Sequence, residues 1–498
     1  MPRRLAGRIE YRYLVAGAFV FGLFMEILDT TIVNVALPTM GREFHAGTNA
    51  LEWVVTGYLL SLAVWIPASG WIGDRFGTKR TFLFATATFV VGSALCGRAW
   101  SVESLAIFRV IQGIGGGMMT PVGTAMMYRV FSAQERARAS AIIGVPTQLA
   151  PMLGPLLGGF LVTDINWRWI FYVNVPVGIL SFAFSFLALR EHTEPAAGRF
   201  DPFGFVFSAL GLAGVLYALS QGPEIGWGAP VVLLTGLGGL LSFALLVKFE
   251  RRMAIPMLDL GLLRNRVFGI ANLIAFSLFA AQTGILFLLP LFLQNLLGLS
   301  ALDAGLITFV QPLATILMVQ VTSRLYLRLG PRLNLVICTF GIVLTSVLLM
   351  LVGLHTSLWW IRAIMMLRGV SGAFMMVSVQ TTAFATIARD RMGRASSLFN
   401  TQRQAAASFG VAILATLLIS RTKALLPSAV GSSLAAAQRA SLLAFHEAFA
   451  GAAILGLLGV YCAFKIHNRD VFGAHSSPPP TEPPAALPPA RAYAPAGN

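Results

Sequence analysis

Residues 28–38 read LDTTIVNVALP and lie within an apolar segment, from about Tyr13 to Leu37, that is long enough to cross a bilayer. The segment also contains Glu26, three residues before Asp29, so the two carboxylates share one face of a helix. A charge at this depth costs about 2.5–3.5 kcal/mol on insertion scales, so such residues are rare without a function. We therefore predict that this face lines a protein cavity. The alternative is a buried hydrogen-bonded pair that only orders the helices.

The composition of the whole chain is that of an integral membrane protein. Of its 498 residues, 56% are hydrophobic and only 11% are charged, with a mean hydropathy of +0.76. Soluble domains carry about 25% charged residues. The three cysteines are far apart and lie inside apolar segments, which predicts neither a disulfide framework nor a metal site.

Apolar windows of membrane-spanning length recur about fourteen times along the chain. This pattern predicts an all-α integral membrane protein. We expect the spans near residues 13–37, 52–72, 80–98, 104–129, 139–162, 169–189, 203–221, 230–249, 268–293, 302–326, 333–353, 358–387, 396–419 and 447–466.

The net charge of +16 follows from membrane topology and does not indicate nucleic-acid binding. With a cytoplasmic N-terminus, 27 of the 36 Lys and Arg residues fall in cytoplasmic segments and two lie within spans. This asymmetry follows the positive-inside rule and predicts that both termini are cytoplasmic. The seven basic residues on the other side are Arg42, Arg98, Arg168, Arg362, Arg421, Lys423 and Arg439.

The chain divides into two similar blocks of six spans around a central insert. The fourth span of each block carries an arginine close to glycines, Arg109 in the first block and Arg368 in the second. Two parallel six-helix repeats are the architecture of many secondary transporters, whose substrate site lies between the repeats. We expect a cytoplasmic N-terminus at 1–12, a six-helix bundle at 13–189, a linker with two inserted spans at 190–265, a second bundle at 266–467 and a disordered Pro-rich cytoplasmic tail at 468–498.

A tight, basic loop follows the second span, where the sequence reads GWIGDRFGTKR. Its glycines permit close backbone approach, and its acid can cap a helix or pair with an arginine. We interpret this loop as a latch between the two bundles at the cytoplasmic gate. The alternative is a basic loop that only determines topology. The gate residues are Gly70, Asp74, Arg75, Gly77 and Arg80.

Arg109 is a permanent cation inside a span and needs an acceptor. Glu26 and Asp29 are the candidates, with Gln112 nearby as a polar neighbour. An ion pair that forms and breaks changes the proton affinity of the acid, which would couple transport to protons. A fixed structural salt bridge is the alternative.

The fifth span contains many Gly and Pro residues, which a membrane helix tolerates only where neighbours satisfy its backbone. Small residues also let a partner helix approach closely. We predict a pliable helix at the interface of the two bundles, although a simple packing seam would have the same composition. The residues concerned are Gly144, Gly154, Pro155, Gly158 and Gly159.

Amide, aromatic and methionine side chains recur in the spans and together suit a roomy cavity for varied amphipathic molecules. Each Met or Phe taken alone more often belongs to ordinary packing. The candidate cavity residues are Asn34, Tyr58, Gln112, Gln282, Phe287, Gln311, Met376, Gln380 and Asn400. No nucleophilic triad, HExxH motif or P-loop is present, so we expect neither an enzyme nor an ATP-driven pump, and no cofactor or metal.

Several of these motifs match a known family. The matching stretches are 28–38, 70–80, 109–117 and 154–159, together with WRWIFYVNVP at 167–176 and LFNTQRQ at 398–404. Over about residues 10–467 the chain resembles the fourteen-helix drug:proton antiporters of the major facilitator superfamily, the QacA/EmrB type. Gly73 and Thr78 depart from the pattern, because alanine and arginine are usual there.

The resemblance implies the major facilitator fold with 14 transmembrane helices, formed by two six-helix bundles and two inserted linker helices. Asp29 matches the acidic residue of the family's first-helix motif and Arg109 its fourth-helix arginine, whereas Glu26 is less typical. The Gly154-Pro155 pair matches the family's antiport motif, which favours export over uptake.

We therefore predict a proton-coupled antiporter in the plasma (inner) membrane that exports amphipathic, cationic or neutral drugs by alternating access. The proton gradient would drive it, with no cofactor. Its partners would be small amphipathic molecules, protons and membrane lipid, without nucleic acid; a periplasmic adaptor is left open. The alternatives are export of an endogenous lipid, siderophore or amino acid on the same fold, a non-transporting sensor or scaffold, and an uptake symporter.

Overall fold

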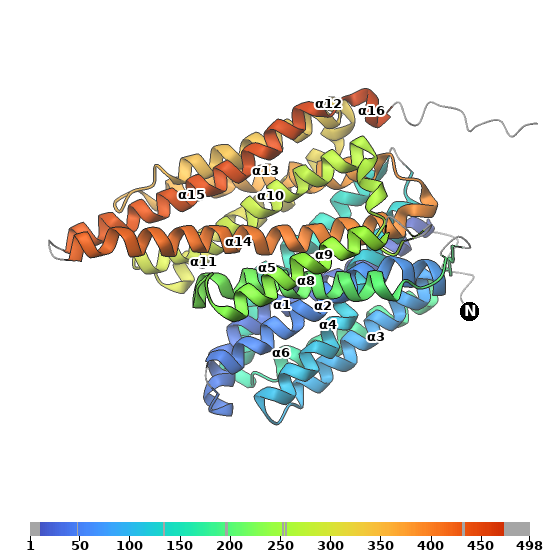
Figure 1. Ribbon diagram of the computed structural model, residues 1–498, viewed down its shortest axis with the longest axis horizontal. Helices are drawn as coiled ribbons and strands as arrows, with labels where there is room; N and C mark the ends of the chain where they lie inside the picture. The colour runs from blue at the N-terminus through green and yellow to red at the C-terminus, as the bar shows by residue number, and fades with distance from the viewer. Residues whose placement is uncertain are drawn as a thin grey trace, which may run out of the picture.

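The computed structural model describes residues 10–46, 48–132, 135–194, 198–250, 253, 256–430 and 434–472. The first nine residues lie outside these ranges, as does most of the tail expected at 468–498, from residue 473 onward. The first five residues of that tail are helical (Asn468–Phe472), which corrects the expected boundary of the disordered segment. The described part of the chain is helical, without strands, and long helices run side by side along most of the molecule (Figure 1).

The first half of the chain forms seven helices in this order. They are α1 (Tyr11–Phe44), α2 (Thr48–Phe76), α3 (Thr78–Gly97), α4 (Val102–Val130), α5 (Arg136–Phe160), the short α6 (Trp169–Tyr172) and α7 (Asn174–Ala188). A π-helical turn, Leu161–Ile165, extends α5. Ser101 begins α4 with a reciprocal capping box, because its side chain accepts from the Ser104 backbone and Ser104 caps Ser101 in return.

The second half begins with two inserted helices, α8 (Pro202–Ile225) and α9 (Pro230–Glu250). The following helices are α10 (Arg266–Leu291), α11 (Ala301–Thr308), α12 (Val310–Leu349), α13 (Leu358–Ala385), α14 (Met392–Val430), α15 (Leu434–Lys465) and α16 (Asn468–Phe472). Short 3-10 turns precede α10 at Leu260–Arg264 and α14 at Arg389–Arg391, and a π-helical turn follows α10 at Phe292–Leu296.

Thirteen segments within the described ranges are long and apolar enough to cross a membrane. One of them, Asp303–Leu349, is 47 residues long and is divided by Gly330, whose φ of 78° breaks the helix ahead of Pro331. Counting its two arms separately gives fourteen spans. The all-α membrane fold with fourteen spans that the sequence predicts is therefore confirmed.

Two groups of helices pack separately and meet along a seam. Helices α1–α7 pack on one another, as do α10 and α12–α15. Across the seam, α5 contacts α12 and α13, while α14 contacts α2 and α4. Figure 1 shows the blue and cyan helices of the first group below the yellow and orange helices of the second. We call these groups the first and second bundles.

The inserted helices α8 and α9 pack on each other as a hairpin, and α8 also contacts α2 and α14. Trp53 of α2 stacks on Tyr217 of α8, with ring centroids 6.1 Å apart. The Trp227 indole N–H donates to the Thr416 hydroxyl of α14 at 2.9 Å. The hairpin therefore covers one side of the seam, as the green helices show in Figure 1.

Large apolar side chains face outward around the molecule. Leu180 of α7, Leu234 of α9 and Ile454 of α15 are 65%, 74% and 66% exposed. In water such a surface would be unfavourable, but lipid tails solvate it. Polar and charged groups of the spans instead turn inward, which marks the interior of the bundles as the functional region.

The last two long helices extend well beyond the predicted spans at 396–419 and 447–466. Helix α14 continues to Val430 and α15 begins at Leu434, so most of the segment expected to be a loop is helical. Alanine-rich sequence with few breakers favours helix there. Figure 1 shows the two helices projecting together at the left.

Candidate functional site

A buried ion pair joins α1 to α4 inside the first bundle. Arg109 donates from Nη1 to Oδ2 of Asp29 at 2.5 Å, and the two side chains are 1% and 0% exposed. Arg109 also donates to the Gln112 amide oxygen at 2.7 Å and to the Val54 carbonyl at 3.1 Å. Its guanidinium lies 4.0 Å from the ring centroid of Tyr58. The structure thus gives this intramembrane cation a carboxylate partner.

The second oxygen of Asp29 is held by two amides. Gln112 donates to Oδ1 at 2.9 Å, and Asn174, at the start of α7, donates to it at 3.0 Å. These neutral donors stabilise the ionised carboxylate without adding charge. Both oxygens of Asp29 are therefore engaged by side chains of α4 and α7.

Glu26 does not pair with Arg109, contrary to one of the two expected arrangements. Its Oε2 accepts a hydrogen bond from the Thr120 hydroxyl at 2.6 Å. Thr120 lies about three turns beyond Arg109 along α4, so Glu26 faces a different level of that helix. Glu26 is 8% exposed and takes no part in the Asp29–Arg109 pair.

The corresponding arginine of the second bundle has a neutral environment. Arg368 is fully buried and donates to the Thr345 hydroxyl at 3.1 Å and the Ala281 carbonyl at 3.2 Å. No carboxylate pairs with it within the described ranges. The two blocks are thus similar in sequence pattern but differ at this position, because Arg109 has a carboxylate partner and Arg368, within the described ranges, has only neutral ones.

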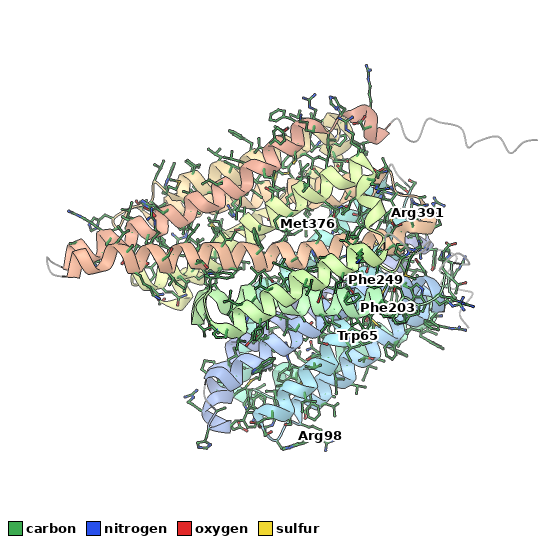
Figure 2. The ribbon with its side chains drawn as sticks, viewed as in Figure 1. Trp65, Arg98, Phe203, Phe249, Met376 and Arg391 are labelled. Carbon is green, nitrogen blue, oxygen red and sulfur yellow. The ribbon has the colours of Figure 1, made fainter. Side chains whose placement is uncertain are left out.

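A central cavity of about 180 Å³ lies between the bundles. Side chains from α1, α4 and α5 line one wall, and those from α10, α12, α13 and α14 line the other. Four of the sequence-predicted cavity residues are in its walls: Gln282, Gln311, Met376 and Gln380. Figure 2 shows Met376 in the middle of the molecule, between the bundles.

Two further cavities are nearer the end of the molecule opposite the beginning of α1. One, of about 250 Å³, is lined by Asn34, Tyr58 and Arg109, so it reaches the ion pair. The other, of about 600 Å³, lies between α2, α8, α10 and α14 and is lined by Phe287. Asn34, Tyr58 and Phe287 therefore line cavities, but not the central one.

Two predicted cavity residues line none of these three spaces. Gln112 is fully buried. Its amide oxygen accepts a hydrogen bond from Arg109, and its amide nitrogen donates one to Asp29. Asn400 is 1% exposed, and its side chain donates to the Ser396 carbonyl at 2.9 Å in its own helix. A polar residue in a span can thus satisfy its neighbours without meeting a ligand.

The bundles meet tightly at the end where α1 begins and α15 ends, which we call the termini end. Asp74 is 1% exposed and accepts from Arg129 of α4 at 2.6 Å. Arg129 in turn donates to the Arg389 carbonyl of the second bundle at 3.2 Å. A Cβ on Gly393 would lie 2.6 Å from an oxygen of Asp74, so α14 begins directly against this carboxylate.

The other gate residues surround this contact in different ways. A Cβ on Gly70 would lie 2.6 Å from the Gly393 carbonyl oxygen, so the two helices approach there as closely as glycines allow. Gly77 has a φ of 102°, which permits the turn between α2 and α3. Arg75 is exposed, and Arg80 lies 3.6 Å from Glu191 in the same half of the chain, so neither arginine crosses the seam.

More hydrogen bonds cross the seam near the termini end. Arg136 of α5 donates to the carbonyls of Phe384 and Ala385, the latter at 3.1 Å. Ser140 and Thr381 hydroxyls are 2.9 Å apart, and Ser396 donates to the Pro121 carbonyl at 2.7 Å. The seam is closed at this end, while the cavities lined by Arg109 and by Phe287 lie toward the other end.

The glycines of α5 do not all lie at the seam, which corrects the sequence prediction. A Cβ on Gly144 would lie 2.9 Å from Met376 and from Val319, across the seam. Gly154 and Gly158 instead pack against α1 within the first bundle, and a Cβ on Gly159 meets nothing within 4 Å. These two glycines therefore let α5 approach α1 closely just beyond the turn that carries Asp29.

Replacing Gly154 with Ala should destabilise the protein, whereas Gly159→Ala should not. The new Cβ at residue 154 would lie 2.2 Å from the Thr31 hydroxyl, so α5 must move away from α1. We expect a loss of about 1–3 kcal/mol for this overpacking. Thermal unfolding of the purified variants in detergent measures it. Equal melting temperatures for the two variants would contradict this packing.

Sequence reasoning missed four residues that the structure places at the site. Asn174 and Arg403 lie in the stretches 167–176 and 398–404, which were singled out without an assigned role. Arg129 and Gly393 complete the contact around Asp74. Only a three-dimensional arrangement shows these partners, because each comes from a helix distant in sequence.

Two helical bundles with a cavity between them, and an acid–arginine pair that a second cavity reaches, are the arrangement of a multi-pass membrane transporter of the secondary class. The family model of the Major Facilitator Superfamily matches residues 19–411, and the chain belongs to that superfamily. This agrees with the resemblance that the sequence motifs carry.

Two curated relatives are similar to this chain in sequence, and a solved structure is similar to it in fold. "Multidrug resistance protein B homolog" of Mycobacterium tuberculosis (strain ATCC 25618 / H37Rv) is 33% identical over 81% of this chain and 75% of its own. "Uncharacterized MFS-type transporter YhcA" of Bacillus subtilis (strain 168) is 30% identical over 80% and 75%. The crystal structure of the human organic anion transporter MFSD10 (TETRAN) has a TM-score of 0.61 at 16% identity, covering 89% of this chain and 99% of that one. This last likeness shows the shared fold.

Proposed function

We propose that the protein is a proton-driven antiporter that exports amphipathic small molecules by alternating access. The observation that carries the proposal is the Asp29–Arg109 pair, which is buried in the spans and reached by a cavity. A charged pair at this depth is costly and is typical of proton relays in transporters. The multidrug-resistance name of the relative that is 33% identical supports export as the direction.

The distribution of Lys and Arg supports a cytoplasmic location for the termini end. In that orientation the contacts around Asp74 would close the seam to the cytoplasm, and the cavities lined by Arg109 and by Phe287 would lie toward the outside. A secondary transporter alternates between this state and one in which the seam opens at the cytoplasmic end. We propose the plasma (inner) membrane as the location.

The ion pair provides a coupling step in this cycle. A proton that enters from the outer cavity neutralises Asp29 and weakens its attraction for Arg109. Arg109 then relies on the Gln112 and Val54 oxygens and the Tyr58 ring. The weaker attraction between α1 and α4 favours the state that is open to the cytoplasm. In that state the cargo binds and the proton leaves. The proton gradient therefore drives export without a cofactor.

Everted membrane vesicles test the proposal, because their exposed face is cytoplasmic and respiration acidifies their interior. Vesicles that contain the protein should accumulate at least one dye from a panel of cationic, neutral and anionic fluorescent amphipaths. A protonophore should abolish the accumulation, and vesicles without the protein are the control. Accumulation that survives the protonophore would contradict proton coupling. Silence across the whole panel would instead favour an endogenous cargo.

A further inference from the structure

The central cavity has an unusual charge for an exporter expected to take cationic drugs. Among the residues that line it, Arg403 of α14 is charged and none is acidic. The rest of the wall combines apolar side chains with amides and hydroxyls, such as Phe279, Met375 and Gln148. A cation approaching this wall meets a positive charge of the same sign.

Arg403 has no tight partner of its own. Within the described ranges no carboxylate lies at ion-pair distance and no hydrogen bond to its guanidinium occurs. Its aromatic neighbour is Phe279, whose ring centroid is 5.9 Å from the guanidinium carbon. Glu26 is the acid whose charge acts on it, but Glu26 is committed to Thr120 and is not part of the cavity wall.

An arginine held at this depth without a tight acceptor is unfavourable unless something else satisfies it. The guanidinium presents five donors in a planar fork that matches a carboxylate in two hydrogen bonds. Amide side chains from α5, α10, α12 and α13 stand around the same space, and an amide NH₂ group can donate to a carboxylate. The wall therefore offers a fixed cation, further hydrogen-bond donors and an apolar surface together.

Building on the proposed export function, we propose that the central cavity binds amphipathic carboxylates, with Arg403 receiving the carboxylate and the aromatic and methionine side chains receiving the apolar part. This assignment revises the cationic or neutral cargo that the sequence predicts. The cavity of about 180 Å³ fits the head of such a molecule, and its remainder extends along the seam. Arg403 is then the residue that determines the charge of the cargo.

Glu26 lies directly behind the cavity wall, because its carboxylate accepts a hydrogen bond from Thr120, whose side chain lines the cavity. A negative charge at that place would oppose an incoming carboxylate. Glu26→Gln should therefore strengthen carboxylate binding, while leaving the Asp29–Arg109 pair in place.

Binding of two matched probes tests the proposal. Dansylglycine carries a carboxylate and dansylglycinamide replaces it with a neutral amide, and dansyl fluorescence reports binding to the purified full chain in detergent. We expect the wild type to bind the carboxylate about tenfold more tightly than the amide. Arg403→Gln should remove that preference, and Arg403→Lys should keep part of it. Arg362→Gln, which removes an arginine over the Trp359 ring at the other end of α13, is the matched control.

Equal binding of the two probes to the wild type would overturn the proposal, as would a preference that survives in a folded Arg403→Gln protein. If Arg403→Gln does not fold, the wild-type comparison and Arg403→Lys still decide. The readout needs no transport, so failure of the charge preference is distinct from failure of proton-driven export, which the vesicle experiment measures.

Discussion

Asp29→Asn should abolish substrate-coupled proton movement while the protein still folds. The substitution keeps the shape of the side chain and the hydrogen bonds near Oδ1, but it removes the group that binds a proton and neutralises Arg109. Because an unpaired buried charge remains, we also expect a loss of stability of up to about 3–5 kcal/mol. Removing both charges, in Asp29→Asn with Arg109→Gln, should restore part of that stability.

Proton release measures this effect directly. In weakly buffered solution, adding a dye that the vesicles accumulate should release protons from the wild type, which a pH indicator detects. Asp29→Asn should release none. Glu26→Gln should still release protons, and Asp164→Asn, which changes an exposed acid, is the matched control. Release that is retained in Asp29→Asn but lost in Glu26→Gln would assign the coupling role to Glu26 instead.

Asp74→Asn should open the termini end of the seam. Asp74 is buried, neutralises Arg129 and lies against the first turn of α14. Breaking a buried ion pair costs about 3–5 kcal/mol. The ion pair itself lies within the first bundle, but Asp74 also lies against α14 and Arg129 donates to the Arg389 carbonyl across the seam. We expect the part of the cost that falls on these contacts across the seam to shift the equilibrium toward the open state, about tenfold for each 1.4 kcal/mol.

Distances between spin labels at residues 76 and 391 can measure this opening. Both positions are exposed and lie on opposite sides of the contact, and Cys96, Cys338 and Cys462 would be replaced first. We expect a longer and broader distance distribution in Asp74→Asn than in the wild type. Arg75→Gln, an exposed neighbour in the same loop, should leave it unchanged. Identical distributions for wild type and Asp74→Asn would show that the loop is not a latch.

The fold could be predicted from the sequence because membrane solvation makes hydrophobic length decisive. A span needs about 20 apolar residues, and such windows are visible without any tertiary information. Helix ends were harder to place. Helices α14 and α15 extend past their apolar windows, because alanine-rich segments remain helical where they leave the predicted membrane core.

The site was predictable where an intramembrane charge required a partner. The cost of burying Arg109 pointed to an acid on another span, and Asp29 is that acid in the structure. The neutral donor Asn174 could not be selected, because an amide in a span has many uses. Glu26 and Asp29 share a face of α1, yet Glu26 contacts Thr120 and Asp29 contacts Arg109, about three turns apart on α4. Sequence spacing does not show how α1 and α4 are aligned along their lengths.

Cavity residues were the least predictable part. Phe287 and Gln311 are each one residue among many similar ones, and helix packing alone decides that they face different cavities. Arg403 was visible in a singled-out motif, but its role depends on the absence of an acid from the surrounding wall. The sequence shows that Arg403 is charged. Whether an acid faces it in the cavity depends on how six other helices pack around it.

Proton flux in liposomes tests the central claim, exchange of cargo against protons, most directly. Purified protein would be reconstituted with a pH-sensitive dye inside, and a dye that the vesicles accumulate would be added outside. We predict that inward cargo movement through the wild type drives protons outward, so the interior becomes more alkaline, and that Asp29→Asn liposomes respond like empty ones. Acidification of the interior, which would mean that cargo and protons move together, would contradict antiport.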